Sequence, residues 1–239
     1  MTREQIYGRR PVREALRGPR EVLELWVTER ALKAEPWLRE ARPGARHQVR
    51  PERDLTEAAG TRDHQGVLAW AEPYRYADAY ELAAQESPLI VCLDQVTDPH
   101  NLGAVARTAE AAGATGVVVP AHNAARVTPA VVRASAGAIE HLPVAVVKNM
   151  ARYLSEVKGP RLWAWAAAGD AETPLWEADL TGGVALVLGA EGKGVRPLVR
   201  RTCDAAVSIP LAGEVESLNV SVAAGVLLFE ARRQRNGTM

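Results

Sequence analysis

Apolar runs alternate with helix-patterned segments from residue 89 to the end of the chain. The runs LIVCLD, GVVVP, VAVV and GVALVLG are apolar almost throughout, and segments such as NLGAVARTAEAAG separate them. Strands that are apolar on both faces are typical of a parallel sheet with helices on both sides. We therefore predict an open α/β domain over residues 89–239, whose ligands would bind outside the carboxyl ends of the strands.

The first part of the chain has shorter elements. The segments YGRRPVREALRG and RDLTEAAG have helical patterns, whereas VLELWVTE and GVLAWAE have strand patterns. These segments predict a small α/β domain over residues 1–72. Residues 73–88 begin and end with proline and contain three tyrosines. We interpret them as a linker between the two domains.

Composition narrows the class of protein further. The chain has 239 residues, 47% of them hydrophobic and 24% charged, which is ordinary for a globular protein. No apolar run approaches the roughly 20 residues of a membrane-spanning helix, and the first residues lack the apolar stretch of a signal peptide. Cys92 and Cys203 lie in apolar segments without metal-ligand spacing. We therefore expect a cytoplasmic protein with neither disulfides nor a metal site.

Polar residues gather at three strand-to-loop junctions of the predicted C-terminal domain. In LDQVTDPHNLGAVARTAEAAG, a strand ends at Asp94, a helix begins near Asn101, and Arg107 lies about two turns further on. Asn101 could simply cap the helix and Arg107 could simply be exposed. The small residues around Arg107, however, would let a large anionic ligand approach it.

The second junction, LVLGAEGKGVRP, is rich in glycine. Gly189, Gly192 and Gly194 surround Glu191. The spacing matches neither a P-loop nor the dinucleotide fingerprint, which argues against nucleotide triphosphate chemistry and against a nicotinamide-dependent oxidoreductase. The segment could be a flexible turn with a solvated glutamate. It could also bring backbone close to a small cofactor, with one carboxylate beside it.

The third junction, SIPLAGEVESLNVSVAAG, precedes the last helix. Ser217 is a good candidate for the N-cap of that helix. Asn219 would then lie inside the first turn, where asparagine is a poor helix former. A cap explains Ser217 but leaves Asn219 as a candidate functional residue.

In this order, the three junctions resemble the motifs of the SpoU family of RNA ribose 2′-O-methyltransferases, within the SPOUT superfamily. The resemblance rests on DPHNLGAVARTAEAAGATGVVVP, LVLGAEGKGVRP and SIPLAGEVESLNVSVAAGVLLFEA. The segments YGRRPVREAL and RDHQGVLA are similar to the ribosomal-protein-like RNA-binding domain of members that modify ribosomal RNA. The resemblance thus covers essentially the whole chain.

This resemblance implies an S-adenosylmethionine-dependent enzyme, most similar to members that methylate a guanosine of 23S rRNA. It also implies a deep trefoil knot, which general topology rules would not have suggested, and a homodimer that shares its active site at the interface. A tRNA or a 23S rRNA adenosine are alternative targets. A non-catalytic RNA-binding module in ribosome assembly is the alternative of a different class.

The resemblance also assigns site residues. The family's catalytic positions correspond to Asn101, Arg107, Glu191, Ser217 and Asn219. The candidate cofactor contacts are Leu188, Gly189, Gly192, Ile209, Leu211 and Leu218. In the N-terminal domain, the candidate RNA contacts are Arg9, Arg10, Arg13 and His64, because cationic and planar side chains bind phosphates and stack on bases.

Methyl transfer to a hydroxyl is an in-line displacement that depends on positioning and on removal of the hydroxyl proton, and it needs no metal. An arginine stays protonated over the accessible pH range. We therefore interpret Arg107 as a fixed cation that holds the RNA phosphate beside the target ribose, while a phosphate oxygen or water receives the proton. Asn101 and Asn219 are expected to hydrogen-bond the ribose or to order the loop backbone.

Overall fold

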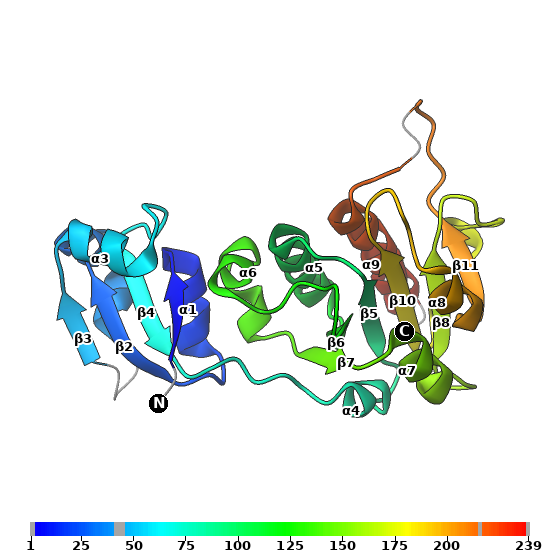
Figure 1. The fold of residues 1–239 in the computed structure, drawn as a ribbon, viewed down its shortest axis with the longest axis horizontal. Helices are drawn as coiled ribbons and strands as arrows, with labels where there is room; N and C mark the ends of the chain where they lie inside the picture. The colour runs from blue at the N-terminus through cyan, green and yellow to red at the C-terminus, as the bar shows by residue number, and fades with distance from the viewer. Residues whose placement is uncertain (1–2, 41–45, 215–216, 238–239) are drawn as a thin grey trace. The chain divides into compact units, whose positions relative to one another are not determined.

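The computed structural model of the chain describes residues 3–40, 46–214 and 217–237. The chain divides into two compact units, each with its own sheet (Figure 1). Unit 1 takes in the chain up to Arg75 and the later segment Val127–His141. Unit 2 takes in Tyr76–Arg126 and the chain from Leu142 onward. Residues 127–141 therefore lie in unit 1, although the sequence places them inside the predicted C-terminal domain.

Unit 1 has a four-stranded sheet of order β1-β4-β2-β3. Strand β4 is antiparallel to β1 and β2, whereas β3 is parallel to β2. The strands are β1 (Glu4–Tyr7), β2 (Val22–Val27), β3 (Arg46–Val49) and β4 (Val67–Ala71). The helices are α1 (Arg9–Arg17), α2 (Glu29–Ala34), α3 (Glu52–Ala59) and α6 (Pro129–Ala134), with short 3-10 helices η1 (Pro36–Glu40) and η2 (Ala138–Glu140). The α/β character predicted for the N-terminal part is confirmed.

A buried ion pair holds the segment 127–141 within unit 1. The Arg20 guanidinium donates to both carboxylate oxygens of Glu140, with Nε 3.0 Å from Oε2, and a third bond of 2.9 Å joins it to Glu4. The side chain of Glu140 is fully buried, and that of Arg20 is 6% exposed. An unpaired charge in the interior lowers the stability of the folded state. Removal of either partner would therefore destabilise unit 1. This pair therefore joins chain segments 120 residues apart.

Unit 2 has a seven-stranded sheet of order β7-β6-β5-β10-β8-β11-β9, in which every pair of neighbours is parallel. The strands are β5 (Leu89–Asp94), β6 (Gly116–Pro120), β7 (Val144–Val147), β8 (Trp163–Ala167), β9 (Thr173–Pro174), β10 (Val184–Gly189) and β11 (Ala205–Ser208). The predicted parallel sheet is confirmed. Strand β10 lies between β5 and β8, so the ends of strands that are distant in sequence lie next to one another.

Helices cover both faces of this sheet. The helices are α4 (Ala79–Ala83), α5 (Pro99–Ala112), α7 (Met150–Val157), α8 (Pro197–Thr202) and α9 (Val220–Asn236), with the 3-10 helix η3 (Leu175–Glu177). Helices α5 and α9 lie side by side, and α9 also packs on β10 (Figure 1). Alternate strand residues such as Ile90 and Val187 pack with Tyr153 of α7 and Val199 of α8 in one buried cluster. Burial of both faces explains why the strands are apolar throughout.

Candidate active site

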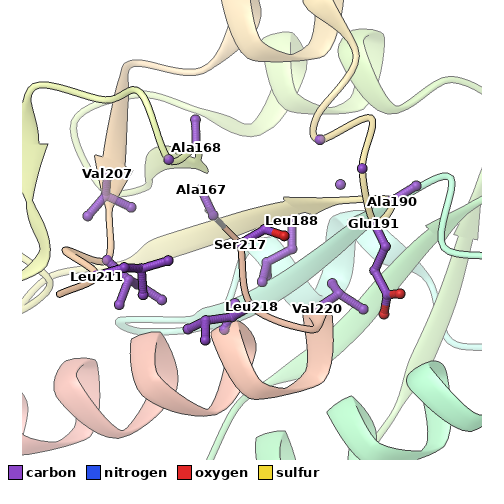
Figure 2. A pocket seen from close by; sticks show the side chains of 16 residues that line it. Ala167, Ala168, Leu188, Ala190, Glu191, Val207, Leu211, Ser217, Leu218 and Val220 are labelled. Carbon is purple, nitrogen blue, oxygen red and sulfur yellow. The ribbon is translucent and has the colours of Figure 1, made fainter. Parts of the chain in front are cut away.

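The carboxyl ends of four neighbouring strands, β5, β10, β8 and β11, meet at one edge of the sheet in unit 2. The loops and helices that follow three of them, β8, β10 and β11, line one pocket (Figure 2). Figure 2 shows the side chains of Leu188, Ser217 and Leu218 gathered in this pocket, with Glu191 at one side. Ligands of open α/β sheets bind at this edge, because loops diverge there from the strand ends.

All six residues that the sequence suggests as cofactor contacts line this pocket. They are Leu188, Gly189, Gly192, Ile209, Leu211 and Leu218. Apart from two glycines, these residues are aliphatic, so the walls they form are apolar. The structure therefore brings together two segments, around residues 188–192 and 209–218, that the sequence placed at separate junctions.

Three glycines allow the tight loop that follows β10. A Cβ atom on Gly189 would lie only 1.9 Å from the carbonyl carbon of Gly194. Gly192 and Gly194 have φ angles of 72° and 63°, in the left-handed region that favours glycine. The amide of Gly194 donates to the carbonyl of Ala190 across 2.8 Å and closes the turn. The glycine pattern in the sequence is thus a steric requirement of this loop.

A hydrogen-bonded cluster of three side chains, the Asn101–Glu191–Asn219 cluster, joins the three sequence motifs beside the pocket. Glu191 Oε1 accepts from Asn101 Nδ2 at 2.9 Å and from Asn219 Nδ2 at 2.5 Å. Asn219 Nδ2 also donates to Asn101 Oδ1 at 3.0 Å. One carboxylate oxygen thus holds the start of α5, the glycine loop and the start of α9 together.

The N-cap of α9 is Asn219, and the prediction that Ser217 would cap this helix is wrong. Asn219 Oδ1 accepts from the amide of Ser221 at 2.9 Å and from its hydroxyl at 2.6 Å. The helix begins at Val220, so Ser217 lies before the capping position and lines the pocket instead. The amide of Asn219 serves two purposes, because its oxygen caps α9 while its nitrogen donates to Glu191.

The first junction is also shifted relative to the sequence prediction. Helix α5 begins at Pro99, and its N-cap is Asp98, whose carboxylate accepts from the amide of His100 at 2.8 Å. Asn101 therefore lies in the first turn and is not a cap. Its side chain is free to bind Glu191, which explains the presence of an asparagine in a helix that does not need it for capping.

Arg107 lies on α5 outside the pocket lining. Its side chain is exposed, and within residues 3–40, 46–214 and 217–237 it has no ion-pair partner. Of the predicted catalytic residues, Asn101, Glu191 and Asn219 thus meet directly, Ser217 lines the pocket beside them, and Arg107 remains on the exposed surface of the same helix as Asn101.

Sequence reasoning missed one wall of the pocket. Ala167, Ala168 and Gly169 at the end of β8 line it, as do Val207 of β11 and Ala223 of α9. The segment LWAWAA was recognisable as a strand, and small residues follow it. Its place beside β10, however, depends on the strand order, which the sequence pattern does not contain.

The arginines suggested as RNA contacts differ in their surroundings. Arg9 is half-buried and pairs with Glu35 at 3.0 Å. The guanidinium of Arg13 lies 5.9 Å from the ring of Trp37. Arg10 is exposed and has no ion-pair partner in the part of the chain that the structure describes. Arg10 is therefore the most available of the three for an external phosphate.

The prediction that His64 contacts RNA is wrong, because its ring is inside unit 1. The residue is 1% exposed. Its Nδ1 accepts from the amide of Gly66 at 3.0 Å, and its Nε2 lies 2.9 Å from the hydroxyl of Thr56. Burial lowers the pKa of His64, which favours the neutral ring. His64 orders the turn before β4 and cannot stack on a base.

Among residues 3–40, 46–214 and 217–237, no helix is both long and apolar enough to cross a membrane. Over the same residues, His, Cys, Asp and Glu side chains form no group of three or more that could hold a metal ion.

Comparison with known families matches both parts of the chain. Residues 88–229 match the SpoU rRNA Methylase family, and residues 5–77 match the family described as RNA 2′-O ribose methyltransferase substrate binding. The chain is 43% identical to a 23S rRNA (guanosine-2′-O-)-methyltransferase RlmB of Pseudomonas putida, over 97% of each chain. It is 41% identical to a putative TrmH family tRNA/rRNA methyltransferase YacO of Bacillus subtilis, over 98% of this chain and 96% of that protein.

Solved structures with the same fold include one with a bound ligand. The SpoU methyltransferase AviRb of Streptomyces viridochromogenes, in complex with the cofactor AdoMet, matches with a TM-score of 0.82 and 29% identity, over 98% of this chain and 91% of that one. An RNA 2′-O ribose methyltransferase matches with a TM-score of 0.83 and 33% identity, over 98% and 89% of the two chains.

Substitution of Asn219 should separate its two roles. We expect Asn219→Ala to lower the free energy of unfolding by about 1 kcal/mol, because the cap of α9 is lost. Asn219→Ser should keep most of that stability, since serine is also a good cap, but it removes the donor to Glu191. Urea denaturation measures the stability, and hydrogen exchange at residues 189–195 measures the order of the glycine loop.

For this pair of variants, faster exchange in the loop of Asn219→Ser at near-normal stability is the expected result. Equal exchange in the loops of Asn219→Ser and the unsubstituted protein would show that the bond to Glu191 does not order the loop.

Proposed function

Because this chain belongs to the SpoU family of rRNA methylases, we propose that it methylates the ribose 2′-hydroxyl of a guanosine in 23S rRNA. The observation that carries this proposal is that the three family motifs, far apart in the sequence, converge on one pocket through the Asn101–Glu191–Asn219 cluster. Relatives named as 23S rRNA guanosine 2′-O-methyltransferases match nearly the whole chain at 40–43% identity. The enzyme class predicted from the sequence is confirmed by this family membership.

The cofactor is S-adenosylmethionine, which supplies an electrophilic methyl group when bound. The pocket in unit 2 suits its adenosine part. Aliphatic side chains such as Leu188, Leu211 and Leu218 offer apolar walls, and the glycine loop offers backbone groups that no side chain obstructs. A Cβ on Gly189 would instead collide with the returning loop backbone.

The residues around this pocket act mainly by positioning. Asn101 and Asn219 hold the carboxylate of Glu191, which keeps the glycine loop at the starts of α5 and α9. Ser217 lines the pocket, and its proposed role is to contact the acceptor ribose. Holding an acceptor oxygen in line with the methyl group supplies much of the rate enhancement in such a transfer.

Arg107 is proposed to hold the RNA phosphate next to the target ribose. It is exposed on α5, and no carboxylate in the described part of the chain pairs with it, so its charge is available to a ligand. A permanently protonated guanidinium cannot take the proton of the 2′-hydroxyl. A phosphate oxygen or a water molecule receives it instead.

The proposed division has an RNA-binding domain at residues 1–72, a linker at 73–88 and a catalytic domain at 89–239, although residues 76–88 belong to unit 2 and residues 127–141 to unit 1. The separate family matches to residues 5–77 and 88–229 support it. Arg9, Arg10 and Arg13 are the proposed contacts to the RNA backbone. The family implies a deep trefoil knot in the catalytic domain. A ribosomal RNA substrate implies a cytoplasmic location.

A second copy of the chain is the proposed partner of helix α9. Val222, Val226 and Phe229 are 51%, 39% and 50% exposed, and their spacing puts them on one face of this helix. An exposed apolar stripe of this kind is typical of a surface that packs against another protein. Since Asn219 caps the same helix, a dimer through this face would bring its interface close to the active site.

The substrate is tested with labelled S-adenosylmethionine and unmodified transcripts of 23S rRNA fragments and of tRNA, followed by mapping of the labelled ribose. We expect label on one guanosine 2′-oxygen of 23S rRNA. Label in tRNA alone would contradict the proposed substrate, and label on an adenosine would contradict the proposed base. No label in any RNA, including ribosomal precursor particles, would contradict the activity itself.

Arg107→Lys tests the phosphate-holding role. Lysine keeps the charge but not the two-pronged donor geometry of arginine. We expect kcat/KM for RNA to fall by about 10-fold or more, while the affinity for S-adenosylmethionine stays the same. Steady-state kinetics and calorimetry measure the two quantities. Full activity in Arg107→Lys would mean that a bidentate phosphate contact is the wrong role.

Phe229→Glu tests the proposed dimer. A charge on the apolar stripe should convert the dimer to a monomer in light-scattering measurements, because a buried unpaired carboxylate is strongly unfavourable. Arg152→Ala, on the exposed surface of α7, is the control and should leave the dimer intact. An unchanged mass for Phe229→Glu would place the interface elsewhere.

A further inference from the structure

An ion pair, the Asp94–Arg196 pair, joins the buried carboxylate of Asp94 to Arg196, whose side chain is 42% exposed, at the base of the glycine loop of unit 2. Asp94 is the last residue of β5, and its side chain is fully buried. Arg196 Nε lies 2.9 Å from Oδ1 and 3.1 Å from Oδ2 of this carboxylate, and the second guanidinium nitrogen lies 2.6 Å from Oδ1. The backbone amide of Arg196 donates to Oδ2 at 3.0 Å.

The two ends of the glycine loop both meet Asp94. In the parallel pairing of β5 with β10, Gly189 lies opposite Asp94, so the loop leaves the sheet beside this carboxylate. The loop returns at Arg196, whose side chain and amide bind the same carboxylate. The backbone from Gly189 to Arg196, which carries Glu191, is therefore closed at its base by one aspartate.

The first motif also leaves the sheet directly after Asp94. The next residue, Gln95, has a φ angle of 62°, which is unfavourable for a residue with a side chain. The chain then leads through Asp98 to Asn101, which binds Glu191. Two chain segments thus leave the Asp94–Arg196 pair and meet again at the Asn101–Glu191 bond, which forms a closed ring of contacts.

We propose that the Asp94–Arg196 pair is a positioning device for the cofactor loop and for the Asn101–Glu191 bond. Neither residue lines the cofactor pocket, so the pair acts through the loop and not by contact with the cofactor. The inference rests on the proposed function, because it assigns the pocket to S-adenosylmethionine.

The chemistry of the pair fits a positioning role better than the role of a surface salt bridge. The hydrogen bonds that Arg196 donates to Asp94 raise the pKa of the guanidinium, which therefore keeps its charge. A planar guanidinium that donates to both carboxylate oxygens fixes the orientation of the two groups as well as the distance between them. An ammonium group fixes only the distance. The buried carboxylate has no access to water that could replace the arginine.

Arg196→Lys in the full chain tests the proposal. The variant keeps a positive charge near Asp94 but loses the bidentate geometry. We expect the Kd and KM for S-adenosylmethionine to rise by about 10-fold or more and kcat to fall, because small displacements of a binding loop are costly. The KM for RNA should change by less than about 2-fold, since RNA is held elsewhere. Hydrogen exchange at residues 189–195 should become faster.

Arg200→Lys is the matched control. Arg200 lies on α8, which Arg196 immediately precedes, and it pairs at 3.0 Å with Asp170, which is exposed. We expect its kinetic constants to equal those of the unsubstituted protein. Asp94→Asn is the second variant, and it should reproduce the rise in Kd for S-adenosylmethionine if it folds.

Unchanged Kd and kcat in Arg196→Lys would overturn the proposal. So would equal losses in affinity for S-adenosylmethionine and for RNA, because a general loss of structure affects both. If the unsubstituted protein binds S-adenosylmethionine but labels no RNA, the proposed function fails. The comparison of Kd values between Arg196→Lys and Arg200→Lys then still decides the positioning role.

Discussion

The architecture of the candidate active site depends on one carboxylate, that of Glu191. Its Oε1 atom accepts hydrogen bonds from two asparagines that are 118 residues apart. Through these bonds, the start of α5, the glycine loop and the start of α9 take fixed positions relative to one another. The pocket beside them is formed largely by aliphatic side chains and glycine backbone, which have no directional bonds of their own. The hydrogen bonds that orient these segments therefore come from this small polar cluster.

The parallel sheet explains why these segments can meet at all. Every neighbouring pair of strands in unit 2 runs in the same direction, so all the strands present their carboxyl ends at one edge. The insertion of β10 between β5 and β8 places the glycine loop at the centre of that edge. The lack of a side chain at Gly189 lets the loop return closely past this strand end, and the ion pair of Arg196 with the buried Asp94 lies where the loop returns.

Buried charge is used in the same way in both units. In unit 1, Arg20 and Glu140 pair in the interior, and in unit 2 Arg196 pairs with the buried Asp94. Such pairs add little net stability compared with apolar packing, because the charges must leave water. They do penalise any arrangement that separates the partners. In this protein, each pair therefore specifies where a segment distant in sequence must lie.

The sequence by itself determined the fold class, the motif order and half of the residues that line the pocket. Apolar runs indicate strands that are buried on both faces, and glycines indicate positions where another backbone segment passes closely. Both signals can be recognised in a short stretch of sequence. The sequence singled out Asn101, Glu191 and Asn219, which the structure joins in one hydrogen-bonded cluster, but it misplaced the cap of α9 at Ser217. Only the tertiary structure showed the interior position of His64 and the β8 wall at Ala167. The Asp94–Arg196 pair was equally hidden, because its partners are 102 residues apart and only the strand order brings them together.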